Sequence, residues 1–317
     1  MVETFRSEIT NPTRRNTTSY LASAQKLYQW MIAPLLAELR SQGIDTLAFS
    51  MDTGLRSLPV AALNDGQQFL VEQYSVALIP SMNLTDTRYQ DIRNSKVLAM
   101  GASKFTKLSS LPAVPVELST IAQQLWSGKS LLNEAFTLAN LKSQRASEPF
   151  GIIHLATHGE FKAGAASNSY IQLWDTQLRL DQLRQLKWNN PPVELLVLSA
   201  CRSALGDEKA ELGFGGLSVA AGVKSALASL WTVSDQGTLG LMSEFYQQLK
   251  TAPIKAEALQ QAQIAMIKGQ VRLEEGQLRS SGQPQGVSLP PELSSLENQK
   301  FSHPYFWAAF TMIGSPW

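Results

Sequence analysis

From residue 96 onward, short apolar segments alternate with segments of helical periodicity, and this alternation limits the possible folds more than any other feature of the sequence. It is typical of a largely parallel sheet flanked by helices, because parallel neighbours must be joined by a crossover, which is usually a helix. The predicted strands are 97–100, 129–132, 151–155, 195–198 and 226–230. The predicted helices are 116–126, 137–146, 215–221, 238–250 and 256–268. We therefore predict an α/β fold with a mostly parallel sheet between helices.

Weaker patterns occupy the rest of the chain. An amphipathic helix is predicted over residues 20–42, because apolar side chains recur there near helical spacing and Gly43 follows. The other predicted elements are strands at 45–51, 58–63 and 69–79, a hairpin at 169–180, an exposed loop at 274–300 and a last strand at 305–313. The loop is predicted because its sequence is rich in Gly, Pro, Ser and Glu and shows weak periodicity.

The distribution of reactive side chains divides the chain into three segments. Residues 1–19 are polar and rich in turn formers, which predicts a linker from a longer polypeptide. Residues 20–92 contain neither histidine nor cysteine, so we expect a supporting subdomain without nucleophilic chemistry. Residues 93–317 contain the three histidines and the single cysteine, so we expect the catalytic domain there.

Composition excludes several classes of protein. The 27 basic and 26 acidic residues among 317 leave a net charge of +1, which gives no electrostatic basis for binding nucleic acid. One cysteine cannot form an intramolecular disulfide, and with three histidines it leaves too few ligands for a structural zinc site. No apolar run is long enough to cross a bilayer, and the first residues lack the apolar core of a signal peptide. We therefore expect a cytoplasmic protein that binds no membrane and needs no metal or organic cofactor.

Two of the predicted strands end in residues that could carry chemistry. One belongs to the sequence G-I-I-H-L-A-T-H-G-E (151–160) and delivers His158; the other belongs to V-E-L-L-V-L-S-A-C-R-S-A (193–204) and delivers Cys201. Ligands bind at the carboxyl ends of the strands in open α/β sheets. A lone histidine or a free cysteine is more often structural, but together the two supply the thiol and imidazole of nucleophilic catalysis. His154 lies inside its strand and is predicted to be a packing residue.

A thiol–imidazole dyad at this edge predicts hydrolysis of peptide bonds. His158 would increase the availability of the Cys201 thiolate and would later protonate the departing amine. The thiolate would attack the scissile carbonyl, and water would hydrolyse the resulting thioester. The N–H groups of Gly159 and Cys201 are the predicted oxyanion donors, since such donors must lie beside the developing charge.

The motifs also resemble those of the CHAT domain, a caspase-like module that is common in bacterial, notably cyanobacterial, proteins and is related to separase. The segments that carry the resemblance are A-T-H-G-E-F, L-S-A-C-R-S-A, G-F-G-G-L-S-V-A-A-G, S-A-L-A-S-L-W-T-V-S-D and H-P-Y-F-W-A-A-F, with L-R-S-L-P-V-A-A-L, G-Q-Q-F-L-V-E-Q-Y-S-V-A-L and P-A-V-P-V-E-L upstream. The resemblance covers most of residues 20–316. It implies a cysteine peptidase with its dyad on His158 and Cys201, and an early region that is a degenerate caspase-like half. Arg202 departs from the acidic residue of many members, at a position outside the dyad.

The substrate pocket is predicted by analogy with separase-like enzymes, which hold arginine with an acid in a comparable region. Asp235 follows the strand at 226–230, so it is the candidate for binding a basic P1 residue, the residue on the amino side of the cleaved bond. Ser199 and Trp231 are the candidate walls of that pocket, and Asp207 is a second candidate acid. Capping of the next helix by Ser234 and Asp235 would explain the same residues without any substrate.

Other functions compete with a cysteine endopeptidase that acts on protein substrates. Ser218, Asp235 and His303 have the order of an α/β-hydrolase triad, but the G-L-S-V-A sequence lacks the last glycine of a nucleophile elbow. The H-x-x-x-H pattern of His154 and His158 lacks the glutamate of a zinc protease. The second hypothesis is therefore a catalytically silent caspase-like interaction module, joined to regulatory or scaffold domains outside this chain. Retention of both dyad residues favours the peptidase.

Overall fold

A computed structural model describes residues 1–52, 54–160, 166–200, 213–281, 283–294 and 298–317. Within these ranges the chain forms an eight-stranded sheet in the order β1-β2-β15-β10-β9-β5-β3-β4. Neighbouring strands are parallel except β10 and β15, which are antiparallel. The strands are β1 (Thr46–Phe49), β2 (Ser75–Leu78), β3 (Val97–Gly101), β4 (Gly128–Leu132), β5 (Ile152–Ala156), β9 (Leu195–Ala200), β10 (Ser225–Ser229) and β15 (Phe310–Gly314). The predicted mostly parallel α/β sheet is confirmed.

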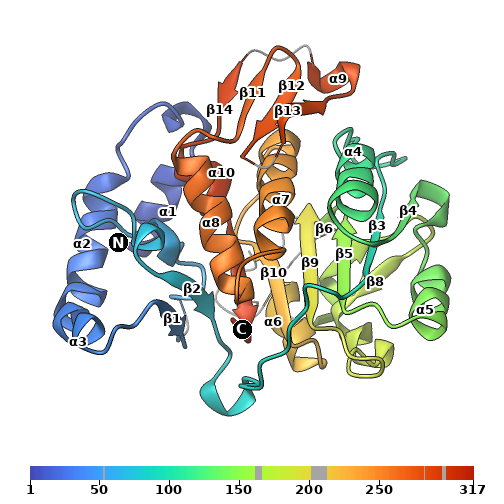
Figure 1. The fold of residues 1–317 in the computed structure, drawn as a ribbon, viewed down its shortest axis with the longest axis horizontal. Helices are drawn as coiled ribbons and strands as arrows, with labels where there is room; N and C mark the ends of the chain where they lie inside the picture. The colour runs from blue at the N-terminus through green and yellow to red at the C-terminus, as the bar shows by residue number, and fades with distance from the viewer. Residues whose placement is uncertain (53, 161–165, 201–212, 282, 295–297) are drawn as a thin grey trace.

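Helices follow the strands as the alternation predicts. The helices of this part of the chain are α4 (Val114–Ser119) with a π-helical continuation (Thr120–Leu125), α5 (Leu138–Ser147), α6 (Gly213–Ala220), α7 (Asp235–Leu249) and α8 (Lys255–Ile267). In Figure 1, α7 and α8 lie across one face of the sheet. Successive strand residues enter different cores, since Ile152 packs in the core that includes these helices and Ile153 packs in a second core. Burial on both faces explains why the strands read as continuous apolar runs.

The N-terminal region is more ordered than its polar sequence predicts. Residues 1–19, predicted to be a linker, include helix α1 (Val2–Thr10), which buries Phe5 and Ile9, and a 3-10 turn (Pro12–Arg14). Phe5 and Ile9 are four residues apart and therefore share one helical face. The predicted helix at 20–42 is present as α2 (Leu21–Met31) and α3 (Leu36–Ser41), which are separated by a 3-10 turn at Ala33–Leu35.

Two predicted strands before residue 80 are partly or wholly replaced by 3-10 turns. The small apolar run at 58–63 forms the turn Val60–Ala62, which follows a proline that has no N–H for a sheet ladder. The predicted strand at 69–79 begins instead with the turn Leu70–Glu72, and only β2 is extended. The Glu72 carboxylate accepts a hydrogen bond from the Phe69 N–H at 2.8 Å and so stabilises that turn.

The C-terminal region departs furthest from the predictions. The predicted loop at 274–300 is a four-stranded antiparallel sheet, here called the accessory sheet, in the order β13-β12-β11-β14. Its strands are β11 (Arg272–Glu274), β12 (Gln277–Ser280), β13 (Gln283–Ser288) and β14 (Gln299–Lys300), and helix α9 (Pro291–Ser294) joins the last two; Figure 1 shows this sheet beyond one end of α7. Glu275 and Gly276 both have positive φ, 52° and 72°, which is the backbone of a two-residue hairpin turn.

The last predicted strand, 305–313, is only half extended. Its first part forms helix α10 (Pro304–Trp307), and β15 follows at residue 310. Helix formation is favoured because Pro304 fits the first helical position and the His303 ring accepts a hydrogen bond from the Tyr305 N–H at 3.2 Å. His303 is thus a helix cap, not the start of a strand.

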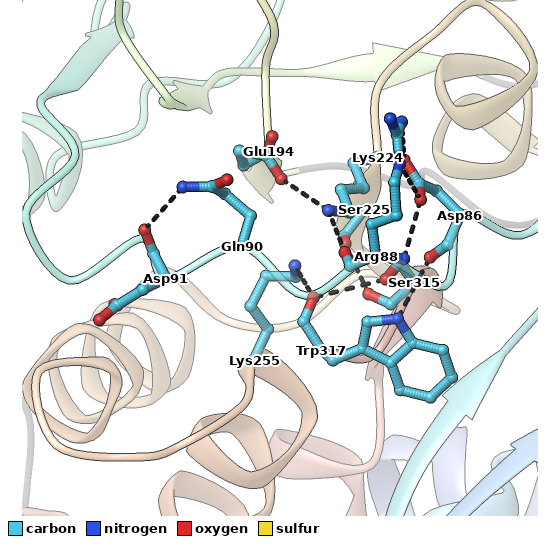
Figure 2. A network of polar contacts seen from close by, with 10 residues as sticks. All are labelled: Asp86, Arg88, Gln90, Asp91, Glu194, Lys224, Ser225, Lys255, Ser315 and Trp317. Atoms are coloured by element: carbon cyan, nitrogen blue, oxygen red, sulfur yellow. Dashed lines mark hydrogen bonds and ion pairs between the residues drawn. The ribbon is translucent and has the colours of Figure 1, made fainter.

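A polar network lies at the edge of the sheet where β9 and β10 begin (Figure 2). Lys255, at the start of α8, is buried and donates from Nζ to the Trp317 carbonyl oxygen. The Trp317 indole N–H in turn donates to the Asp86 carbonyl oxygen at 3.2 Å, and Lys224 forms a 3.3 Å ion pair with Glu194. These contacts join the C-terminal residues to the segment between β2 and β3.

Among the described residues, no helix has both the length and the apolar character to cross a membrane.

Candidate active site

A cavity of about 710 Å³ lies at the carboxyl edge of β5, β9 and β10. Its described lining consists of residues 108–112 after β3, His158–Glu160 after β5, Tyr170, Ser199, Ser229, Thr232, Val233, Asp235, Thr238, Leu293 and Phe310. The cavity is therefore formed where parallel strands end, as expected for open α/β sheets. It brings together His158 and Gly159, Ser199, and Asp235 from three separate places in the sequence.

The hairpin that follows β5 fixes the backbone around His158. The hairpin strands β7 (Tyr170–Gln172) and β8 (Gln177–Arg179) confirm the prediction at 169–180, and β7 also pairs with β6 (Gly159–Glu160). The Gln172 N–H donates to the His158 carbonyl oxygen at 2.8 Å, and the buried Thr157 hydroxyl donates to the Gln172 carbonyl oxygen at 2.6 Å. The chain that carries the imidazole is thus held by Gln172 at two consecutive residues, Thr157 and His158.

The imidazole of His158 is oriented by two contacts. Its Nε2 lies 2.8 Å from the Ser109 carbonyl oxygen, and its ring packs edge-on against Phe105 with centroids 4.8 Å apart. A carbonyl oxygen only accepts, so Nε2 must carry the proton. In the neutral ring Nδ1 is then unprotonated and can accept a proton from a reacting group.

The predicted nucleophile and the second predicted acid, Cys201 and Asp207, lie outside the described residues. The strand that leads to the cysteine is described up to Ala200, whose partner in the β5–β9 register is Ala156. Ala156 precedes His158 by two residues and Ala200 precedes Cys201 by one. The two chain segments therefore leave adjacent parallel strands at the same edge.

Asp235 is the first residue of α7, and its half-buried side chain lines the cavity. The helix cap is Ser234, whose hydroxyl oxygen accepts from the Gly237 N–H at 3.2 Å. The Asp235 carboxylate instead accepts from the Ala113 N–H, at 3.2 Å, at the beginning of α4. Burial raises the pKa of Asp235 to about 6, the Ala113 N–H opposes this rise, and the Glu117 charge adds to it.

The two predicted walls of the pocket have different outcomes. Ser199 lines the cavity, is almost fully buried, and its hydroxyl has no hydrogen-bond partner among the described residues. Trp231 is buried, its indole N–H donates to the Tyr305 carbonyl oxygen at 2.9 Å, and it does not contribute to the described lining. Its role as a wall stays a prediction, while Thr232 and Val233, which follow it, belong to the described lining.

Several lining residues are missing from the predicted site. The segment at 108–112 could have been anticipated, since it follows β3, which ends at the same edge of the sheet. Glu160 follows the H-G dipeptide and forms a side-chain hydrogen bond with Tyr170 that raises the pKa of this tyrosine, together with the larger effect of burial. Leu293 comes from α9, which follows β13 of the accessory sheet, and no local sequence signal relates it to His158.

Within the described residues, no group of three or more His, Cys, Asp or Glu side chains is arranged to hold a metal ion.

Several solved structures share this fold. One is separase in the Saccharomyces cerevisiae separase–securin complex, with a TM-score of 0.50 and 12% identity over 82% of this chain and 15% of that chain. Another is the Arg-specific cysteine proteinase gingipain R, with a TM-score of 0.50 and 10% identity over 98% of this chain and 69% of that one. The complex of Porphyromonas gingivalis RgpB pro- and mature domains matches with the same score and identity, over 98% and 71% of the two chains. At 10–12% identity, the likeness to these structures shows a shared fold and nothing more.

The family follows from the sequence match. The CHAT domain profile matches residues 21–315, which is most of the chain, so this chain belongs to the CHAT domain family. The resemblance found in the sequence motifs is thereby confirmed. No curated protein sequence matches the chain.

Proposed function

We propose that this chain is a cysteine endopeptidase that cleaves protein substrates through His158 and Cys201, after a basic P1 residue. The observation that carries the proposal is the orientation of His158, whose Nε2–H is committed to the Ser109 carbonyl oxygen beside a cavity at the strand ends. A histidine held in this way keeps Nδ1 available as a base. A structural histidine needs neither the cavity nor the free nitrogen.

The proposed reaction uses groups of this chain alone. The Cys201 thiol transfers its proton to Nδ1 of His158, and the thiolate attacks the scissile carbonyl carbon. The N–H groups of Gly159 and Cys201 stabilise the oxyanion, and the loss of such a donor typically slows acyl transfer about 100-fold or more. The imidazolium protonates the amine as the C–N bond breaks, which leaves a thioester. Water attacks the thioester with His158 as general base and regenerates the thiol.

The preference for a basic P1 residue rests on Asp235. Its carboxylate lines the same cavity as His158, and the only hydrogen bond described for it comes from the Ala113 N–H, so lone pairs remain for a cationic side chain. The Ser199 hydroxyl, which has no hydrogen-bond partner in the part of the chain that the structure describes, is a second acceptor in the cavity. Gingipain R, which shares the fold, is Arg-specific according to its description, which agrees with this assignment.

Substitution of the two dyad residues tests the reaction. Cys201→Ala is expected to abolish cleavage of a casein or peptide-library substrate, with an unchanged circular dichroism spectrum. A thiol-directed peptide probe is expected to label the wild-type chain, and labelling is expected to fall strongly in His158→Ala. A folded chain that the probe does not label, alone or together with its upstream domains, would instead indicate a silent interaction module.

Substitution of Asp235 tests the specificity. A peptide-library profile of the wild type is expected to show arginine or lysine at P1, and Asp235→Ala is expected to lose this preference. Persistence of the basic preference in Asp235→Ala would remove Asp235 from the pocket while leaving the dyad intact.

A further inference from the structure

The segment between β10 and α7, residues 230–234, carries Thr232 and Val233 into the candidate cavity and ends one residue before Asp235. Beyond Leu230, whose N–H donates to the Ala309 carbonyl oxygen at 2.6 Å, this connection belongs to no strand, so its conformation depends on the side chains around it. Outside α7, the described hydrogen bonds between this segment and side chains, or between its side chains and backbone, involve α10 and the N-terminal region, and neither contributes a described residue to the cavity lining. We call residues 230–234 the pocket loop.

Tyr305, in helix α10, holds the pocket loop at two consecutive residues. Its hydroxyl donates to the Thr232 carbonyl oxygen at 2.8 Å, and its own carbonyl oxygen accepts from the Trp231 indole N–H at 2.9 Å. Trp231 and Tyr305 are both buried. Two hydrogen bonds between buried side chains and the backbone therefore fix the direction in which Thr232 enters the cavity.

Helix α10 also packs against the first turn of α7, which begins with Asp235. A Cβ atom placed on Gly237 would lie 2.8 Å from Cδ1 of Phe306 and 3.3 Å from Cγ1 of Val233. This approach is too close for any side chain larger than hydrogen. The backbone that carries Asp235 is thus in direct contact with the residue after Tyr305.

The N-terminal region supports the same arrangement from the other side. The Arg15 guanidinium lies 3.7 Å from the centroid of the Tyr305 ring, a cation–π geometry that holds this ring in place. In α1, Arg6 donates from Nη2 to the Leu230 carbonyl oxygen at 3.4 Å, while Phe5 and Ile9 of the same helix are buried in the core. Helix α1 therefore contacts Leu230, and helix α10 contacts Trp231 and Thr232.

We propose that Tyr305 and Arg15 are positioning residues for the substrate pocket: they hold the pocket loop in the conformation that binds the P1 side chain. This inference rests on the proposed function and assigns to residues 1–19 and α10 a role that neither the dyad nor Asp235 requires. A loop that is ordered before binding avoids an entropy loss when the substrate arrives, so loosening it weakens binding without changing the groups that react.

The first experiment is kinetic and uses Tyr305→Phe and Arg15→Gln with a reporter peptide that ends in arginine. Tyr305→Phe removes only the hydroxyl and keeps the ring, and Arg15→Gln removes only the cation. We expect KM to rise about five-fold in each variant, the effect of one hydrogen bond or cation–π contact, with kcat within about two-fold of the wild type. The matched controls are Tyr89→Phe and Arg14→Gln, whose side chains are exposed, and they are expected to leave both constants unchanged.

The second experiment does not depend on activity. Hydrogen–deuterium exchange is measured across residues 228–240 in the four variants, and we expect faster exchange there in Tyr305→Phe and Arg15→Gln but not in the controls. Unchanged exchange, or a fall in kcat at constant KM, would overturn the positioning role. A wild-type chain that cleaves nothing would defeat the proposed function, and the exchange data would still decide whether Tyr305 and Arg15 order the pocket loop.

Discussion

Nε2 of His158 lies 2.8 Å from the backbone oxygen of Ser109, on the segment that follows β3. This contact joins two neighbouring strand ends, because β3 and β5 are adjacent in the sheet. It determines which nitrogen of the ring carries the proton, and it does so with a backbone group that no side-chain substitution removes. The base of the proposed reaction is therefore oriented by the main chain, and only its ring packing depends on a side chain.

The ring packing of His158 can be tested at Phe105. Phe105→Ala removes the aromatic edge that lies against the imidazole, while the Ser109 oxygen remains. The imidazole gains rotational freedom, and we expect kcat to fall about ten-fold or more with a small change in KM, because the proton acceptor is less often aligned. Phe105→Leu retains apolar bulk and is expected to lose less. Equal kcat values in the wild type and Phe105→Ala would show that the carbonyl alone orients the ring.

The raised pKa of Asp235 predicts a pH-dependent cost in stability. A carboxyl that titrates near 6 when folded and near 3.8 when unfolded binds more protons in the folded state between these values, so stability falls as pH rises through this window. Asp235→Asn stays neutral and can still accept from the Ala113 N–H. We expect the variant to gain about 1 to 3 kcal/mol over the wild type between pH 4 and pH 7.

Urea unfolding at pH 4, 5.5 and 7 measures this difference. Asp175→Asn, at an exposed position in the hairpin, is the control and is expected to follow the wild type at every pH. An Asp235→Asn variant that is no more stable than the wild type at pH 7 would mean that the carboxylate is well solvated. It would then be a poor site for selective binding of a cation.

The sequence predicted the central part of the fold because that part obeys simple periodicity. The strands β3, β5 and β9 are buried on both faces, so each is a continuous apolar run, and these strands end at one edge of the sheet. The pairing of His158 with Cys201 was inferred from these strand ends and is also implied by the resemblance to the CHAT domain, and it stays a prediction. The contact between His158 and Ser109 was not predictable, because a backbone oxygen 49 residues away has no sequence signature.

The predictions differ from the structure where a polar, turn-rich sequence forms regular secondary structure. The accessory sheet is built from short strands and a Glu275–Gly276 turn with positive φ, so its polar, glycine-rich sequence resembles a loop. Helix α1 contributes few apolar residues, and only the spacing of Phe5 and Ile9 indicates that it is buried.

The attachment of the accessory sheet is expected to depend on Glu244 of α7. This buried carboxylate accepts from the Ser281 N–H at 3.0 Å, from the Ser281 hydroxyl, and from Gln248 Nε2 at 2.7 Å. Glu244→Gln replaces one acceptor oxygen with an NH₂ donor that faces other donors. We expect a loss of about 1 to 3 kcal/mol in stability and faster proteolysis between residues 274 and 300. Glu292→Gln, at an exposed position of the same region, is the control. Equal proteolysis rates would show that apolar packing alone attaches this sheet.

The buried Lys255 predicts a stability difference at alkaline pH. Burial lowers its pKa from 10.5 to about 8, and the Lys224 charge adds to this effect, although Glu194 and Asp86 oppose it. Between pH 8 and 10.5 the unfolded chain binds the proton and the folded chain releases it, so folding becomes more favourable as pH rises through this window. Because Lys255→Met has no titrating group at this position, the stability of the wild type should rise by about 3 kcal/mol relative to this variant from pH 8 to 10.5.

Denaturant unfolding of both chains at pH 7.5, 9 and 10.5 measures this difference in stability. Tyrosines that titrate in both chains contribute equally and cancel in the difference. Lys250→Met, with its exposed side chain at the end of α7, is expected to show no such trend. A constant difference between the wild type and Lys255→Met would mean that the Trp317 carbonyl contact and nearby carboxylates in Figure 2 keep the ammonium charged throughout.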